Sequence, residues 1–140
     1  MQIIGMEKGG NMKLIIGGCA QGKLAYACLK YHCKEEQVWD GILPDVDAVA
    51  GQNQTLVINH FHQWVKSRMA EGKNPKEEIF SFLNHCEDCI IISDEIGNGL
   101  VPVDAFERKY RECTGRILIQ LAKQAKEVER VICGIGQRIK

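Results

Sequence analysis

Residues 17–24 combine glycines and a lysine at a spacing suited to phosphate binding. This segment, Gly17-Gly18-Cys19-Ala20-Gln21-Gly22-Lys23-Leu24, fits the P-loop pattern G-x-x-x-x-G-K-[ST] at every fixed position except the last. In such a loop, backbone N–H groups surround phosphate oxygens and the lysine reaches the β- and γ-phosphates of a nucleotide. The last position, whose hydroxyl ligates Mg²⁺ in the full motif, is Leu24. We therefore predict phosphate binding with weakened Mg²⁺ coordination.

The context of the loop decides between this interpretation and an ordinary glycine-rich turn. The apolar run 13–16 is typical of a buried strand, and residues 23–33 carry apolar side chains with few helix breakers. Strand, glycine turn and helix is the arrangement that a P-loop requires. A turn that only connects the two elements is the alternative.

Asp94 and Glu95 are the candidate carboxylates of the same site. They directly follow the strongly apolar run 89–93, which predicts a buried strand. Carboxylates there can hold Mg²⁺, directly or through water, or orient an acceptor hydroxyl. Together with Lys23 they form the predicted catalytic set. The alternative is that both acidic residues cap a turn.

Two histidines, His60 and His62, follow the predicted strand 55–58 in the segment Asn59-His60-Phe61-His62. A histidine at this edge of a sheet can act as a covalent nucleophile or a metal ligand. The alternative is that these side chains cap or pack against the next helix.

Cys86 and Cys89 form the C-x-x-C pair of the chain, with His85 beside them. A structural zinc site ordinarily needs a fourth ligand and a second pair, so we interpret the segment as a helix-to-strand turn and assign it no metal. The seven cysteines are an odd number and lie mostly in predicted helices or strands, among them Cys28 and Cys33 in a helix and Cys133 in a strand. They are expected to be reduced and packed as small apolar side chains.

Alternating strands and helices must position these residues. Strands are predicted at 13–16, 38–42, 55–58, 89–93 and 130–135, and helices at 23–33, 61–72, 75–83 and 104–126, with 43–54 a connection. The long helix carries a stripe of apolar residues with helical spacing, Phe106, Tyr110, Cys113, Ile117 and Leu121. The expected fold is α/β, a mostly parallel sheet with helices on both faces. Its ligands gather at the carboxyl ends of the strands.

Composition limits the function classes further. The chain has 140 residues, 45% of them hydrophobic, and 18 basic residues balance 18 acidic ones. We expect one domain over residues 12–140 after a loosely ordered tail at 1–11. Balanced charge argues against nucleic acid as a partner. No apolar run approaches the roughly 20 residues that span a membrane, so a cytoplasmic protein is expected.

Four segments, in the same order along the chain, resemble motifs of the adenosylcobinamide kinase/adenosylcobinamide-phosphate guanylyltransferase family of cobalamin biosynthesis. Ser93-Asp94-Glu95-Ile96-Gly97-Asn98-Gly99-Leu100-Val101-Pro102 resembles the T-N-E-V-G-x-G-I-V-P segment of the family, and Gly17 to Lys23 corresponds to its G-G-A-R-S-G-K. Phe106 to Arg116, ending in Thr114-Gly115-Arg116, is similar to the F-R-D-x-x-G-R helix, and Gly134-Ile135-Gly136 with Ile139-Lys140 resembles S-G-I-G-x-x-I-K. The order and spacing of these segments make the resemblance specific.

The resemblance implies a RecA-like P-loop fold, usually a homotrimer, that uses GTP or ATP in two reactions. In the first, the aminopropanol hydroxyl of adenosylcobinamide is phosphorylated. In the second, GMP is transferred to that phosphate through a guanylylated histidine. Phosphate binding carries over to Gly17, Gly18, Gly22 and Lys23, and a polar role at the active edge carries over to Glu95.

Three departures from the family pattern separate two hypotheses. Leu24 replaces the P-loop serine, the segment 43–54 contains no counterpart of the family's H-H-x-x-R-P, and no carboxylate lies at Ile58-Asn59. One hypothesis is an adenosylcobinamide kinase-like enzyme that lacks the guanylyltransferase histidine. The other is a catalytically degenerate relative that binds a nucleotide or corrinoid as a regulatory protein.

Overall fold

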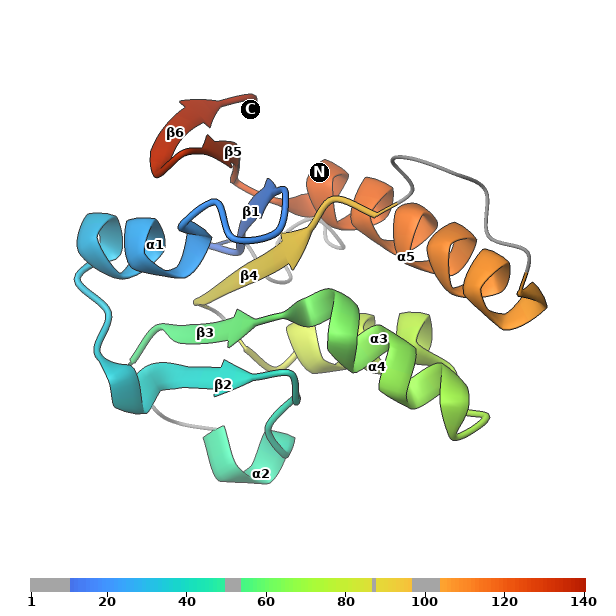
Figure 1. Ribbon diagram of the computed structural model, residues 1–140. Helices are drawn as coiled ribbons and strands as arrows, with labels where there is room; N and C mark the ends of the chain where they lie inside the picture. The colour runs from blue at the N-terminus through green and yellow to red at the C-terminus, as the bar shows by residue number, and fades with distance from the viewer. Residues whose placement is uncertain (1–10, 50–53, 87, 97–103) are drawn as a thin grey trace, which may run out of the picture.

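A six-stranded sheet with the strand order β2-β3-β4-β1-β5-β6 organises the chain (Figure 1). The computed structural model describes residues 11–49, 54–86, 88–96 and 104–140. The strands are β1 (Lys13–Gly17), β2 (Val38–Asp40), β3 (Leu56–Asn59), β4 (Cys89–Asp94), β5 (Glu127–Ile132) and β6 (Ile135–Arg138). The first five pair in parallel and β6 pairs antiparallel to β5. The predicted α/β fold with a mostly parallel sheet is confirmed.

Helices cover both faces of this sheet. They are α1 (Lys23–Tyr31), the 3₁₀ helix η2 (Glu35–Gln37), α2 (Val46–Val49), α3 (Phe61–Ala70), α4 (Pro75–Leu83) and α5 (Ala105–Gln124). Successive strand residues face opposite sides: Leu14 packs in the cluster formed with α3, α4 and α5, whereas Ile15 packs in the cluster formed with α1. The two clusters place the core on both sides of β1 and β4.

The long helix α5 begins directly after Asp104, close to the predicted helix start at residue 104. The Asp104 side chain accepts hydrogen bonds from the backbone N–H groups of Phe106 at 2.7 Å and Glu107 at 3.4 Å. The predicted stripe packs against the sheet: Tyr110, Ile117 and Leu121 are buried, and Phe106 and Cys113 pack beside them. A capped, amphipathic helix of this length therefore forms one wall of the core.

The prediction of one strand from 130 to 135 is wrong. Ile132 pairs with Ile135 across a two-residue turn, in which Cys133 has φ 51° and Gly134 has φ 76°. Two positive φ angles are typical of a type I′ hairpin turn, which reverses the chain into the antiparallel strand β6. Cys133 thus lies in a turn rather than a strand.

Smaller corrections concern the ends of elements. Helix α1 ends at Tyr31, so Cys33 lies beyond it, and α5 ends at Gln124. The connection after β2 contains the one-turn helix α2. Residues 1–10 of the predicted tail and residues 97–102 of the family-like segment lie outside the described residues.

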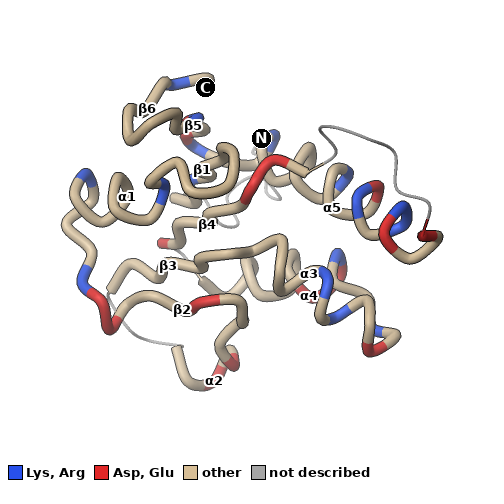
Figure 2. Tube along the Cα trace, viewed as in Figure 1, with Lys and Arg blue, Asp and Glu red and all other residues tan. Residues whose placement is uncertain are grey.

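Figure 2 shows lysine and arginine interspersed with aspartate and glutamate, including along α5. None of the helices in the described ranges is long and apolar enough to cross a membrane.

Candidate functional site

The glycine-rich loop between β1 and α1 has the backbone geometry of an anion-binding turn. Ala20 has φ 58° and Gly22 has φ 83°, both in the left-handed region. Turns that alternate right- and left-handed residues form concave arrays of N–H groups that bind anions. Gly17 is required for a different reason, because a Cβ there would lie 2.6 Å from the carbonyl oxygen of Val131 on β5.

Gln21 anchors this loop to the β5–β6 turn. Its side-chain oxygen accepts a hydrogen bond of 2.6 Å from Cys133 N, and its carbonyl accepts one of 2.8 Å from Gly134 N. The β5–β6 hairpin, which the sequence does not predict, therefore holds the glycine-rich loop in place. The left-handed turn holds its two backbone donors toward Gln21.

Lys23 is buried at the centre of the site, with 8% of its side chain exposed. Its ammonium donates to the carbonyl oxygen of Gly18 at 2.6 Å and to Asp94 Oδ1 at 2.7 Å. Gly17 pairs with Asp94 in the register of β1 and β4, so the parallel sheet brings the two predicted residues together. A buried ammonium at the start of a helix is suited to hold phosphate oxygens.

Leu24 packs into the α1 side of the core and also lines the cavity. It supplies no oxygen, as the sequence indicates. Glu95 lies elsewhere: its Oε2 atom is 2.9 Å from Arg130 Nε on β5, and its backbone N–H donates to Gly17 O. Of the two predicted carboxylates, Asp94 borders the cavity and Glu95 pairs with an arginine beside it.

His62 holds Asp94 through both of its ring nitrogens. Nδ1 accepts a hydrogen bond of 3.1 Å from the backbone N–H of Asp94, and Nε2 lies 3.3 Å from Asp94 Oδ2. Burial lowers the pKa of His62, and the nearby Asp94 carboxylate only partly opposes this effect. The neutral ring with hydrogen on Nε2 satisfies both contacts.

A second polar cluster, Asp40-Asn59-His60, lies at the ends of β2 and β3. Asp40 Oδ1 is 2.5 Å from His60 Nδ1 and accepts a hydrogen bond of 2.9 Å from the Asn59 side chain. The register pairs Asp40 with Asn59. Sequence reasoning finds Asn59 and His60 but misses Asp40. A carboxylate near the carboxyl end of a predicted strand is the signal that could have found it.

One cavity of about 300 Å³ joins the loop to both histidines. Its lining comes from the loop and the start of α1, from the ends of β3 and β4, and from the start of α3: Cys19, Ala20, Gln21, Gly22, Lys23, Leu24, Ala25, Asn59, His60, His62, Gln63, Ile92, Ser93 and Asp94. Residues far apart in sequence thus meet at the carboxyl edge of the sheet, where parallel sheets bind ligands.

The cysteine pair lies away from this cavity. Cys89 is the first residue of β4, at the amino end of the strand, and Cys86 is buried just before it. Within the described ranges, no group of three His, Cys, Asp or Glu side chains is arranged to hold a metal ion.

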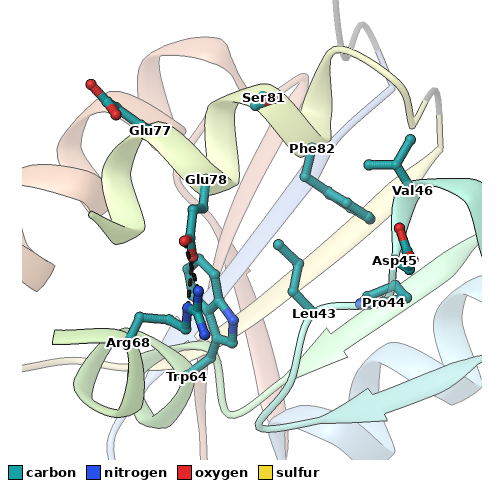
Figure 3. A pocket seen from close by; sticks show the side chains of 10 residues that line it. All are labelled: Leu43, Pro44, Asp45, Val46, Trp64, Arg68, Glu77, Glu78, Ser81 and Phe82. Atoms are coloured by element: carbon teal, nitrogen blue, oxygen red, sulfur yellow. Dashed lines mark hydrogen bonds and ion pairs between the residues drawn. The ribbon is translucent and has the colours of Figure 1, made fainter. Parts of the chain in front are cut away.

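A second pocket of about 560 Å³ lies between the β2–α2 connection and helices α3 and α4 (Figure 3). Leu43, Trp64 and Phe82 supply its apolar side. Arg68 and Glu78 form a two-bond ion pair at its rim, with distances of 2.7 and 2.8 Å. The arginine is therefore engaged by a carboxylate rather than directed at an open anion site.

Comparison with known proteins identifies the family. The sequence profile described as cobinamide kinase / cobinamide phosphate guanyltransferase matches residues 35–139, well over half of the chain. The chain belongs to this family. The matched range contains Asp40, His60 and Asp94 and begins after the glycine-rich loop.

Two curated relatives bear the same name, bifunctional adenosylcobalamin biosynthesis protein CobU. The Escherichia coli (strain K12) protein is 35% identical over 82 residues, which cover 56% of this chain and 44% of the relative. The Salmonella typhimurium protein is 31% identical over 97 residues, covering 66% of this chain and 49% of the relative. The matched part thus spans about half the length of these relatives.

Proposed function

We propose that the chain is a nucleotide-binding protein of cobalamin biosynthesis that transfers the γ-phosphoryl group of GTP or ATP to the aminopropanol hydroxyl of adenosylcobinamide. The observation that carries this proposal is the buried Lys23–Asp94 ion pair beside the glycine-rich loop, in which Ala20 and Gly22 have left-handed backbone conformations. Family membership supplies the substrate class, since the relatives are named for adenosylcobalamin biosynthesis.

Nucleotide binding requires Lys23 to exchange partners. In the structure its ammonium is held by Gly18 O and Asp94 Oδ1. Phosphate oxygens at the loop take over these contacts, and the lysine then offsets the charge that spreads over the γ-phosphoryl oxygens during transfer. The burial of Lys23 strengthens this interaction because little water competes for the ammonium.

The donor set suits Mg²⁺ that is held mainly by phosphates and water. Leu24 provides no ligand, which leaves Asp94 as the carboxylate in contact with the lysine. Mg²⁺ commonly keeps several waters and binds proteins through one or two carboxylates. When bound, the ion would neutralise charge on the phosphates. Asp94 would hold it, while Glu95 stays engaged with Arg130.

A second candidate, nucleotide binding without turnover, is favoured by a specific observation. Leu24 fills the position of the Mg²⁺-binding hydroxyl with a side chain packed into the core. For the same chain we propose that guanylyl transfer through the family histidine segment is absent. The residues 43–54 hold no histidine. A corrinoid or nucleotide sensor fits these two features.

One labelling experiment separates the candidates. The protein is incubated with adenosylcobinamide and GTP labelled at either the α- or the γ-phosphate, and corrinoid and protein are then separated. Transfer of γ-label to the corrinoid supports the kinase. Acid-labile α-label on the protein contradicts the proposed loss of guanylylation.

The matched variants are Lys23→Ala and Lys76→Ala, the latter at an exposed position on α4. The binding role without turnover is supported by two results together: the unaltered protein transfers no label, and nucleotide binding is lost in Lys23→Ala but kept in Lys76→Ala. Retained binding in Lys23→Ala overturns the assignment of the loop. Sedimentation of the same samples tests the homotrimer, which we propose from the family resemblance alone.

A further inference from the structure

The two histidines of the cavity differ in the availability of their ring nitrogens. Both rings line the cavity with the loop residues, and their centroids are 5.8 Å apart in an edge-to-face arrangement. In His62, both Nδ1 and Nε2 contact Asp94. In His60, Nδ1 lies 2.5 Å from Asp40 Oδ1 and 3.2 Å from the Asn59 amide nitrogen, and no partner within the described residues contacts Nε2.

The Asp40 carboxylate fixes the tautomer of His60. A carboxylate can only accept a hydrogen bond, so the 2.5 Å contact with Asp40, which is much shorter than the 3.2 Å approach of the Asn59 amide nitrogen, places the proton of the neutral ring on Nδ1. The lone pair is then on Nε2. The Asn59 amide, bonded to the same Oδ1 atom at 2.9 Å, holds the carboxylate in this orientation. An acid that orients a histidine through Nδ1 is the arrangement of a general base and its positioning residue.

Capping does not explain the conformation of His60. It occupies the N-cap position of α3 with φ 53° and ψ 46°, yet its side chain makes no capping hydrogen bond. Backbone strain of this kind is unfavourable and persists at functional sites when the surrounding structure imposes it. Ala20 and Cys133, two other residues with positive φ, lie in or against the phosphate loop.

We propose that His60 is the general base for the acceptor hydroxyl and that Asp40 is its positioning residue. The assignment rests on the proposed phosphoryl transfer. The hydroxyl proton moves to His60 Nε2 as the hydroxyl oxygen forms a bond to the γ-phosphorus. The bond from that phosphorus to the β,γ-bridging oxygen breaks, its electron pair leaves with the nucleoside diphosphate, and the histidine releases the proton to solvent.

The structure excludes the neighbouring groups from this role. His62 is buried, its Nδ1 lone pair accepts from a backbone N–H, and burial lowers its pKa. Asp94 already accepts a hydrogen bond from the Lys23 ammonium at 2.7 Å and contacts His62 through its other oxygen, so both carboxylate oxygens are engaged. His60, half-exposed at the cavity wall, is the base that a hydroxyl can approach.

The test compares His60→Gly with His32→Gly. Both histidines have a positive φ, 53° and 56°, so glycine suits either backbone, and His32 lies at the far end of α1. We measure γ-label transfer from GTP to adenosylcobinamide and to water, GTP affinity, and rescue by added imidazole. His60→Gly is expected to lose about 10²- to 10⁴-fold in transfer rate with GTP affinity unchanged. Imidazole restores part of the rate, and His32→Gly behaves like the unaltered protein.

Asp40→Asn provides a second variant at a residue whose side chain is 64% exposed, so the substitution changes little buried packing. It is expected to lower kcat while leaving the KM for GTP unchanged, a split that a merely structural role would not produce. Full transfer activity in His60→Gly, or a loss of activity that imidazole does not restore, would overturn the assignment of His60 as the general base. The proposed kinase activity would still stand. If the unaltered protein transfers no phosphate to either acceptor, the proposed function fails, and the base assignment fails with it.

Discussion

Lys23 donates a hydrogen bond to Asp94 over 2.7 Å, although 71 residues separate them in sequence. Parallel pairing of β1 with β4 produces this contact, because Gly17 and Asp94 are register partners. The glycine-rich loop and the Asp94 carboxylate therefore occupy one edge as a consequence of sheet topology. The same topology places Asp40 beside Asn59 on the neighbouring strands β2 and β3.

The close packing of Gly17 on β5 gives the first prediction. Gly17→Ala is expected to lower the free energy of unfolding by about 1–3 kcal/mol and to weaken nucleotide binding, because its Cβ would lie 2.6 Å from the Val131 carbonyl. Gly18→Ala is the matched control, since its Cβ would meet only the Gln21 side chain at 3.6 Å. Urea denaturation of both variants measures the difference. Equal stability of the two would contradict the predicted backbone clash.

Leu24→Ser restores the hydroxyl of the full motif. We expect about tenfold tighter binding of GTP in the presence of Mg²⁺, equivalent to ~1.4 kcal/mol, and no gain when Mg²⁺ is chelated. Loss of packing on the α1 side of the core should lower stability by about 1–2 kcal/mol. Calorimetric titration measures the affinities.

Leu29→Ser is the control for this substitution. It changes the same residue type on the same helix at a position that is 82% exposed, so neither affinity nor stability should change appreciably. A Leu24→Ser variant that gains affinity equally with and without Mg²⁺ would show that the hydroxyl contacts phosphate and not the ion.

The local patterns predict the elements that carry the site, because strand and helix periods are strong over long apolar runs. The loop at 17–24 is visible as a motif, and Asp94 is visible because it ends the run 89–93. The placement of Asp94 at the same edge of the sheet as Lys23 also follows from the expected parallel sheet, whereas their direct contact requires β4 to lie beside β1. These predictions need only side-chain period and the rule that ligands gather at the carboxyl edge.

Pairings between distant side chains cannot be predicted in the same way. Asp40 escapes prediction because strand order, which places β2 beside β3, is not encoded in the local pattern of either strand. The turn at Cys133 escapes it because cysteine is unusual at a left-handed position and apolar residues continue on both sides. The contact of Glu95 with Arg130 likewise depends on β5 lying beside β1.

Gly115 gives a prediction that concerns stability alone. It lies inside α5, and a Cβ added to it would have no atom within 4 Å, so Gly115→Ala should raise stability by about 0.5–1 kcal/mol. Gly72→Ala has equal space but φ 75°, and it should lower stability by about 1 kcal/mol or more. Thermal unfolding compares them. Stabilisation by both alanines would show that backbone conformation does not matter here.

The buried Glu129 network connects α1 to β5 and gives a pH dependence. Lys30 Nζ lies 2.5 Å from Glu129 Oε2, Tyr31 donates to the same atom at 2.9 Å, and Tyr26 donates to Oε1. Burial alone raises the pKa of Glu129, but these three donors outweigh it and leave the pKa below its usual value. The folded protein therefore favours the carboxylate.

A lowered pKa in the folded state stabilises the protein above the unfolded-state value of about 4.3. This contribution is expected to disappear as the pH falls from about 4.3 through the folded-state pKa, because the unfolded chain then binds more protons. Glu129→Gln should lower stability at pH 7 by about 2–3 kcal/mol, since three donors lose a charged acceptor. The deficit should shrink at lower pH.

Glu112→Gln is the control, because its ion pair with Arg116 is exposed on α5. Chemical denaturation of the three proteins between pH 3 and pH 7, a range set about the unfolded-state value of ~4.3, measures the expected convergence. A Glu129→Gln deficit that stays constant over this range would mean that the side chain stabilises the fold by packing and not by its charge. Convergence of the curves would instead assign the anchoring of α1, and with it the end of the glycine-rich loop, to this buried carboxylate.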